Sequence, residues 1–268
     1  METLLVQLDR DHPGFRDQSY RARRDAIARI AMDHRPGQPV PLAPYTVEEH
    51  GVWRTILETL APVHARWVCR EMNVVQDALA LDRHEIPQLQ HVNRALSATS
   101  PFSMEPAAGL VTPRVFLEQL GHGIFLSTQY IRHHSRPLYT PEPDVVHELV
   151  GHAASLTHLD IARLSLAFGR AAANADGTLI ERLISLYWYT LEFGALEEDG
   201  AVKAYGAGLL SSAGELARFA TEAELRPWDI DRIATTPFDP TDYQPQIYVA
   251  PSFSTMATDL ATWLTAHA

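Results

Sequence analysis

Apolar residues recur at helical spacing along most of the chain, and Pro, Gly and capping residues separate the apolar segments. The clearest case is "TVEEHGVWRTILETLAP", residues 46–62. Thr46 with Glu49 three residues later forms a capping-box pattern, and Trp53 and Leu60 follow at helical intervals. This pattern predicts a helix that begins just after Thr46.

The same reasoning predicts four further helices. One lies within residues 14–37 and ends where a proline-rich piece begins. The next is expected from Pro62 through Met72. Another starts at Thr112, with Pro113 in the first turn, where a missing N–H costs nothing. The closing stretch "SFSTMATDLATWLTAHA" is amphipathic and predicts a C-terminal helix.

Strand patterns are few and short. "GIFLSTQYIRH", residues 123–133, alternates enough to be extended, and "ALEEDGAVKAYG", residues 195–206, predicts a small hairpin with Asp199-Gly200 at its turn. "IYV", residues 247–249, is a possible third strand. There is no internal repeat and no low-complexity segment. We predict a mainly α fold, one domain of packed helices over residues 1–268 with a minor β-sheet.

Composition and charge exclude several classes of protein. The hydrophobic fraction of 46% and charged fraction of 21% are those of an ordinary globular protein. The net charge of −11, with no basic stripe, makes a nucleic-acid partner a poor hypothesis. No signal-peptide pattern and no membrane-spanning apolar run is present, and Cys69 is the single cysteine. We therefore expect a cytoplasmic protein without disulfides.

The stretch "HELVGH" is the candidate metal site. A zinc-protease motif places two histidines four residues apart on one helical face, but His147 and His152 are five apart. On a straight α-helix they diverge by about 140°. Either the helix is locally widened or ends near Gly151, or a ligand from elsewhere completes a wider, octahedral geometry.

Glu192 is the best candidate for that further ligand. It is a lone carboxylate in the apolar and aromatic run from Leu183 to Phe193, where burial is costly unless the group is paired or bound to a metal. Two histidines and one carboxylate on one octahedral face are the ligands of non-haem Fe(II) oxygenases. From spacing alone, the same residues also fit ordinary core or surface positions.

Four segments resemble the pterin-dependent aromatic amino acid hydroxylases: "TQYIRHHSRPLYTPEPDVVHELVGH" (residues 128–152), "LYWYTLEFG" (186–194), "VKAYGAGLLSSAGEL" (202–216) and "PAAGLV" (106–111). The resemblance spans roughly residues 45 to 255 and is weakest in the N-terminal segment, 1–45. It implies the family's catalytic-domain fold. It also implies the short bacterial type, without a regulatory domain or tetramerisation tail, and hence a monomer.

The resemblance assigns roles residue by residue. It implies that the metal ligands are His147, His152 and Glu192, and that Glu148 and Tyr187 support catalysis. For the pterin it implies Gly109, Val111, Phe116 and Glu148, with Pro113 at a position that often holds serine. For the substrate it implies Arg132 as the carboxylate clamp, supported by Thr140 and Ser211, and a ring pocket of Pro143, Trp188 and Phe193.

The implied activity is ring hydroxylation of a free aromatic amino acid with Fe(II), a tetrahydropterin and O2. Trp188 is typical of members that act on phenylalanine or tyrosine, and Pro240 stands where tyrosine enzymes carry an acid. Phenylalanine, converted to tyrosine, is therefore the expected substrate. Two alternatives within the family stay open, namely meta-hydroxylation of phenylalanine and 5-hydroxylation of tryptophan, because departures such as Leu126 can alter the pocket. A zinc hydrolase with Glu148 as base is the alternative of a different class.

Overall fold

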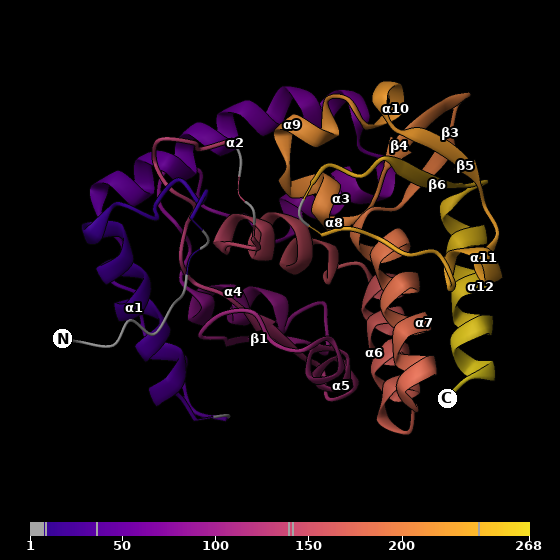
Figure 1. Ribbon diagram of the computed structural model, residues 1–268, viewed down its shortest axis with the longest axis horizontal. Coiled ribbons are helices and arrows are strands. Elements are labelled where there is room, and N and C mark those ends of the chain that lie inside the picture. Colours follow the sequence, from indigo (N-terminus) through magenta and orange to yellow (C-terminus); the bar gives the residue numbers. More distant parts are fainter. Residues whose placement is uncertain (1–7, 9, 36, 139, 141, 241) are drawn as a thin grey trace.

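The computed structural model describes residues 8, 10–35, 37–138, 140, 142–240 and 242–268. Most of the extreme N-terminal stretch considered for a signal peptide lies outside these residues. The described chain is mainly helical, which confirms the predicted fold class (Figure 1). The longer helices are α1 (Gln18–Asp33), α2 (Val47–Trp67), α3 (Arg70–Ala78), α4 (Leu89–Leu96), α5 (Pro113–Gly121), α6 (Leu159–Ala173), α7 (Gly177–Tyr187) and α12 (Phe253–Ala266).

Helix α2 begins as its capping box predicts. Thr46 Oγ1 accepts from Glu49 N at 3.2 Å, and Glu49 Oε2 accepts from Thr46 N at 2.7 Å. The expected division of this region at Pro62 is wrong, because α2 continues through Pro62 to Trp67. The break lies at Val68 and Cys69, where Cys69 N leaves the helical pattern and donates to Ala204 O at 3.0 Å.

The strands form two small sheets. β1 (Ser103–Pro106) pairs in parallel with β2 (Ile124–Ser127). The other sheet has the order β4-β3-β6-β5 and combines the hairpin with two parallel pairings; its strands are β3 (Ala195–Glu198), β4 (Ala201–Ala204), β5 (Glu224–Pro227) and β6 (Gln246–Ala250). The hairpin and the strand at "IYV" are confirmed. The sequence did not separate the two sheets and gave no sign of β1 or β5.

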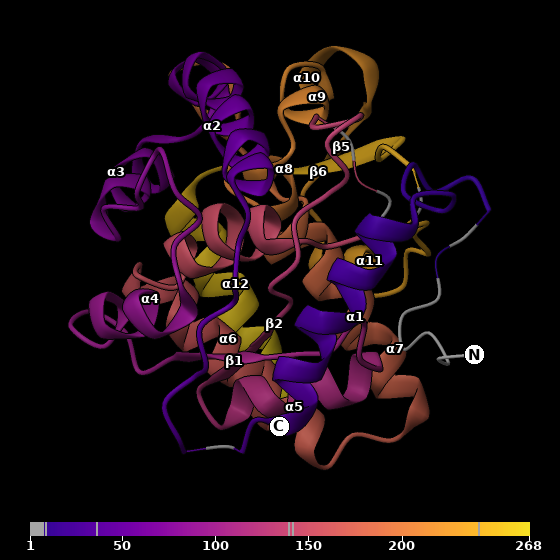
Figure 2. The same ribbon diagram turned by 90° about the vertical axis from the view of Figure 1, so that its left-hand side faces the viewer.

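Between these elements lie short helices and two π-helices. The short helices are α8 (Ala207–Ser211), α9 (Ala213–Leu216), α10 (Phe219–Glu222) and α11 (Ile230–Ile233). The π-helices are η1 (His147–Ala153) and η2 (Trp188–Glu192). η1 crosses the middle of the molecule, while α6, α7 and α12 run side by side on the C-terminal side (Figure 1) and α1 lies on the outside (Figure 2).

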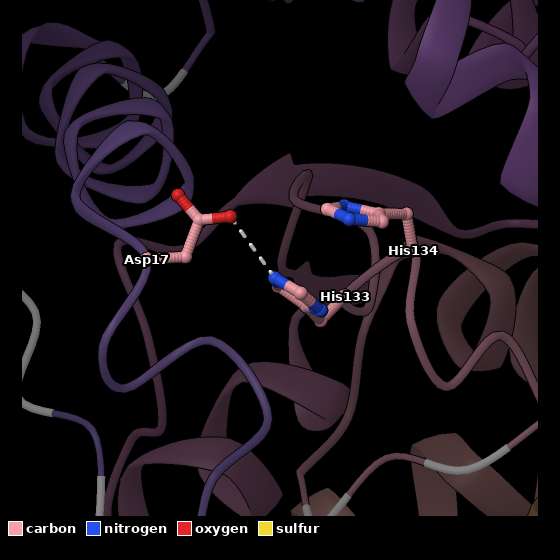
Figure 3. A group of neighbouring side chains, drawn as sticks. All are labelled: Asp17, His133 and His134. Carbon is pink, nitrogen blue, oxygen red and sulfur yellow. Dashed lines mark hydrogen bonds and ion pairs between the residues drawn. The ribbon is translucent and has the colours of Figure 1, made fainter.

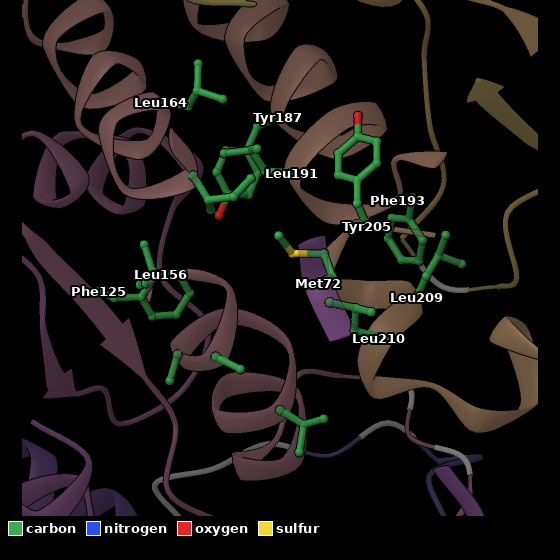
Figure 4. Close-up of a cluster of buried hydrophobic side chains, with 14 of the residues drawn as sticks. Met72, Phe125, Leu156, Leu164, Tyr187, Leu191, Phe193, Tyr205, Leu209 and Leu210 are labelled. Atoms are coloured by element: carbon green, nitrogen blue, oxygen red, sulfur yellow. The ribbon is translucent and has the colours of Figure 1, made fainter. Parts of the chain in front are cut away.

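One hydrophobic core surrounds the π-helices. Buried side chains from α3, β2, α6, α7 and η2 meet in it, including Met72, Phe125, Leu164 and Leu191 (Figure 4). Burial of this apolar area is what holds the irregular segments in place. No helix among the described residues has the length and apolar character needed to cross a membrane.

Candidate functional site

η1 explains the spacing of the two histidines. Its backbone is π-helical from His147 to Ala153, and the i→i+5 bonds of a π-helix bring residues five apart onto one face. The Nε2 atoms of His147 and His152 are 3.0 Å apart. The helix is therefore locally widened, the first of the two arrangements considered from the sequence.

Glu192 arrives from the end of η2 and completes a triangle of ligand atoms. Its Oε1 lies 3.3 Å from His147 Nε2, and its Oε2 lies 3.0 Å from His152 Nε2. Two adjacent ligands that are each about 2.1 Å from one metal ion lie about 3 Å apart. The three side chains are thus already spaced as ligands of a single ion, and they fit the Fe(II) facial triad.

Burial and neighbouring side chains set the protonation of His147 and Glu192. Burial lowers the pKa of His147 to about 4, so its imidazole is neutral near pH 7. Burial alone would raise the pKa of Glu192, but the adjacent imidazoles of His147 and His152, with a hydrogen bond from His152, outweigh it and lower the pKa. A neutral imidazole and an ionised carboxylate are the forms that bind metal ions.

A second layer of contacts orients His147. Its Nδ1 lies 3.0 Å from Ser211 Oγ, and that hydroxyl donates to Ala207 O at 3.0 Å. With Nδ1–H donating to Ser211, the lone pair of Nε2 points at the triad. α8 can come this close because Gly151 lacks a side chain, since a Cβ there would lie 2.6 Å from Ala207 O.

Arg132 is held by a carboxylate that sequence reasoning missed. Its Nε and Nη2 each donate to Asp144 at 2.8 Å, and both side chains are buried. Asp144 Oδ1 also accepts from His147 N at 3.2 Å, so the pair is joined to the start of η1. Burial alone would raise the pKa of Asp144, but Arg132 outweighs it and lowers the pKa. The signal in the sequence was an acid three residues before His147, the position of a helix-capping carboxylate.

A cavity of about 320 Å³ opens beside the triad. Of the fourteen residues given a metal, catalytic, pterin or substrate role, ten line it: Gly109, Val111, Phe116, Pro143, His147, Glu148, His152, Tyr187, Trp188 and Glu192. Four others are not among the lining residues. Arg132 pairs with Asp144, Thr140 donates to Glu142 O at 2.7 Å, Phe193 packs on Trp188 with ring centres 4.7 Å apart, and Ser211 contacts His147.

The carboxyl of Glu148 is bound by Thr128. The Thr128 N–H and Oγ1 both donate to its Oε1, at 3.1 and 3.0 Å. Burial raises the pKa of Glu148 to about 7, so the carboxyl carries a proton in part of the molecules near neutral pH. It can then donate as well as accept in a hydrogen bond with a polar heterocycle.

Aromatic rings form the other walls. Phe116 meets Tyr187 edge to face, with ring centres 5.4 Å apart, and burial raises the pKa of Tyr187 well above its usual value. Phe238 stacks on Trp188 with ring centres 4.3 Å apart and 16° between the planes. Sequence reasoning noted the segment around Phe238 only for Pro240, because no periodicity marks a loop aromatic as part of a pocket.

Asp17, His133 and His134 form a second group with ligand-type atoms in reach of one another (Figure 3). Asp17 Oδ2 lies 3.2 Å from His133 Nε2, while its Oδ1 caps α1 by accepting from Tyr20 N. His133 Nδ1 accepts from Ser135 N at 3.2 Å, which places the ring proton on Nε2, facing Asp17. These contacts describe a hydrogen bond from His133 to Asp17 that ties α1 to the loop after Arg132.

Known proteins match almost the whole length of this chain. Residues 2–267 match the family model described as "Biopterin-dependent aromatic amino acid hydroxylase". The chain is 41% identical to phenylalanine-4-hydroxylase of Caenorhabditis elegans, over 96% of this chain and 58% of that protein. It is 43% identical to tyrosine 3-monooxygenase of Bos taurus, over 92% of this chain and 51% of that protein. The chain spans between half and three-fifths of the length of these relatives.

Solved structures agree in fold. Phenylalanine hydroxylase from Chromobacterium violaceum, with bound iron(III) and oxidised cofactor 7,8-dihydrobiopterin, superposes with a TM-score of 0.80 at 27% identity and covers 90% of each chain. The apo enzyme from Colwellia psychrerythraea gives a TM-score of 0.77 at 26% identity, over 87% of this chain and 94% of that chain.

Proposed function

The chain belongs to the biopterin-dependent aromatic amino acid hydroxylase family, and from this premise we propose that it is a monooxygenase that hydroxylates the ring of free phenylalanine to give tyrosine. Its cofactors are Fe(II), held by His147, His152 and Glu192, and a tetrahydropterin; O2 is the co-substrate. Bound together, iron and pterin supply the activation of O2 that the side chains of the protein cannot supply.

The observation that carries the proposal is the placement of the triad in the wall of an aromatic cavity. His147, His152 and Glu192 occupy one face of the metal position and leave the cavity side open to other ligands. The rest of the lining is mostly apolar, which excludes water from the reacting groups. We therefore infer that the protein positions the pterin ring and the substrate ring beside the metal.

The residues proposed for the pterin all line this cavity. Phe116 offers a ring for stacking, Gly109 and Val111 offer backbone beside it, and Glu148 offers a partly protonated carboxyl. At Gly109 an added Cβ would meet no atom within 4 Å, so the backbone is open to a ligand.

Arg132 is suited to hold the carboxylate of an amino acid. Asp144 takes up the Nε and Nη2 edge of its guanidinium, which leaves Nη1 and the second Nη2 proton as a fork for another carboxylate. The buried ion pair fixes this fork in one orientation. Thr140 and Ser211 support the site indirectly, through Glu142 and His147.

The ring pocket favours phenylalanine. Phe238 stacks on Trp188, and Pro143 and Pro240 line the same cavity; the side chains of these three residues carry no hydrogen-bonding group. A phenol oxygen here would lose its water partners without replacement, which disfavours tyrosine. Overall identity does not choose the substrate, since relatives named for phenylalanine and for tyrosine are matched about equally well. Trp188 also narrows the slot against an indole.

A turnover assay tests the proposal. Purified protein loaded with Fe(II) receives a tetrahydropterin, O2 and phenylalanine, tyrosine or tryptophan, and the products are separated and weighed. We expect phenylalanine to gain one oxygen and to co-elute with para-tyrosine. Co-elution with meta-tyrosine would mean that the enzyme hydroxylates the meta carbon. A product from tryptophan alone would mean that tryptophan is the substrate. The His147→Ala variant is the negative control, and absence of product from all three acids would refute the activity.

We further propose that the chain acts as a cytoplasmic monomer on the free amino acid, without a nucleic-acid or membrane partner. The net charge of −11, without a basic stripe, argues against a nucleic-acid partner. Light scattering coupled to gel filtration tests the monomer, with a mass near 29.9 kDa expected.

A further inference from the structure

One buried amide fixes the indole of Trp188. Trp188 Nε1 donates to Gln244 Oε1 at 2.8 Å, and Gln244 is only 5% exposed. Nε2 of the same amide donates to Asp239 O and Asp242 O, both at 3.1 Å. A single side chain thus joins the start of η2 to two points on the loop that precedes β6.

This loop carries two walls of the cavity. Phe238 and Pro240 both line it, and Asp239, whose carbonyl the amide binds, lies between them. Phe238 stacks on Trp188. The distance between the loop walls and the indole therefore depends on the bridge through Gln244.

An amide is the side chain that this bridge requires. It offers one acceptor for the indole N–H and two donors for the two carbonyls. A carboxylate would accept from Trp188 but has no N–H to donate to the two carbonyl oxygens. A thioether would donate to neither carbonyl and would accept only weakly from Trp188. The main-chain N–H of Gln244 donates to Glu215 Oε1 at 2.8 Å, which fixes the backbone of Gln244 to α9.

We propose that Gln244 is a positioning residue that sets the width of the ring slot, and with it the preference for phenylalanine over a larger ring. The identity of the substrate in this inference rests on the proposed function. The hydrogen bond between Gln244 and Trp188 does not depend on that function. Gln244 reaches the substrate only through Trp188 and the loop, so its loss should change substrate binding more than the chemical step.

The kinetic test compares Gln244→Met and Gln244→Glu with Gln246→Met. Gln246 donates to Tyr189 OH at 3.2 Å and does not line the cavity, so it is the matched control. We expect Gln244→Met to raise KM for phenylalanine about tenfold, with kcat changed less than about threefold. The ratio of kcat/KM for phenylalanine to that for tryptophan should fall about tenfold. Gln244→Glu, which keeps the acceptor, should lie between this variant and wild type. Wild-type KM and ratio in Gln244→Met would overturn the inference.

A spectroscopic readout separates the inference from the proposed function. The chain has five tryptophans, and Trp188→Phe identifies the indole N–H signal of Trp188 in a ¹H–¹⁵N spectrum. Gln244→Met should shift this signal and Gln246→Met should not. An unshifted signal in Gln244→Met overturns the inference whatever the enzyme turns over. If wild-type protein hydroxylates none of the three acids, the proposed function fails. Titration of the same signal with phenylalanine and tryptophan then still compares the ring preference of the variants.

Discussion

His147 and His152 are five residues apart in the sequence, yet their Nε2 atoms lie 3.0 Å apart. An α-helix would turn the two rings about 140° away from each other. η1 prevents this because its π-helical backbone returns to the same face after five residues, and the short π-helix η2 delivers Glu192 to the same point. Two backbone irregularities, both rare, therefore meet at one site and create it.

The first prediction concerns the third ligand. In Glu192→Gln the amide replaces a carboxylate whose oxygens lie 3.3 and 3.0 Å from the histidines, so the negative charge that binds the ion is lost. We expect Fe(II) affinity to fall by more than about 100-fold and hydroxylation to be lost. This exceeds the 10- to 100-fold loss that is typical when a residue hydrogen-bonded to a metal ligand is replaced. Metal content after gel filtration measures it. Glu222→Gln, at an exposed position in α10, is the control and should keep its iron. Equal iron in both variants would contradict the assignment.

A second prediction concerns the hydroxyl behind His147. Ser211→Ala removes the partner of Nδ1, so the ring loses the contact that fixes its tautomer and orientation. Iron affinity should fall about 10- to 100-fold, while the melting temperature changes little. Equilibrium dialysis against a chelator gives the affinity, with the exposed Ser254→Ala as the matched control. If both serine variants hold iron equally well, the contact does not orient the ligand.

Much of the fold followed from local rules that act within a few residues. The capping box at Thr46, the first-turn position of Pro113 and the hairpin turn at Asp199-Gly200 are all confirmed. The division at Pro62 is wrong because α2 tolerates the loss of one hydrogen bond within a packed helix. β1 and β5 gave no periodic signal, since each is four residues long and is defined by its partner strand.

The site residues also divide into those with a local signal in the sequence and those that are recognised only from contacts in the structure. Glu192 could be selected because an isolated carboxylate in an apolar run carries a local energetic signature. Phe238 and Gln244 could not, because their importance comes from contacts with a residue 50 and 56 positions away in the sequence. Asp144 carried only the local signal of a capping acid, and its contact with Arg132 lies 12 positions away. The widened helix was one of the geometries left open, and it occurs where η1 packs against α8.

The third prediction tests that packing. In Gly151→Ala the new Cβ would lie 2.6 Å from Ala207 O, so η1 and α8 must separate. We expect a loss of about 1–3 kcal/mol in the free energy of unfolding, with weaker iron binding because Ser211 moves with α8. In the matched control, Gly177→Ala, no atom lies within 4 Å of the new Cβ, and stability should be unchanged or higher. Urea unfolding measures both. A Gly151→Ala protein as stable as wild type would show that the close approach is not required.

The last prediction concerns Glu215, whose carboxyl accepts a hydrogen bond from the main-chain N–H of Gln244. Burial raises its pKa from 4.5 to about 7. Between these two values the folded state holds a proton that the unfolded state has released, so the free energy of unfolding falls as pH rises through this window and stays lower above it. The full effect is about 3 kcal/mol. Glu215→Gln removes the titration while its Oε1 can still accept from Gln244 N. The variant should match wild type near pH 4.5 and exceed its stability increasingly up to pH 8, as followed by urea unfolding. Glu197→Gln, at an exposed position in β3, is the control for loss of a charge. A stability difference that is the same at every pH would mean that burial of Glu215 does not oppose its ionisation.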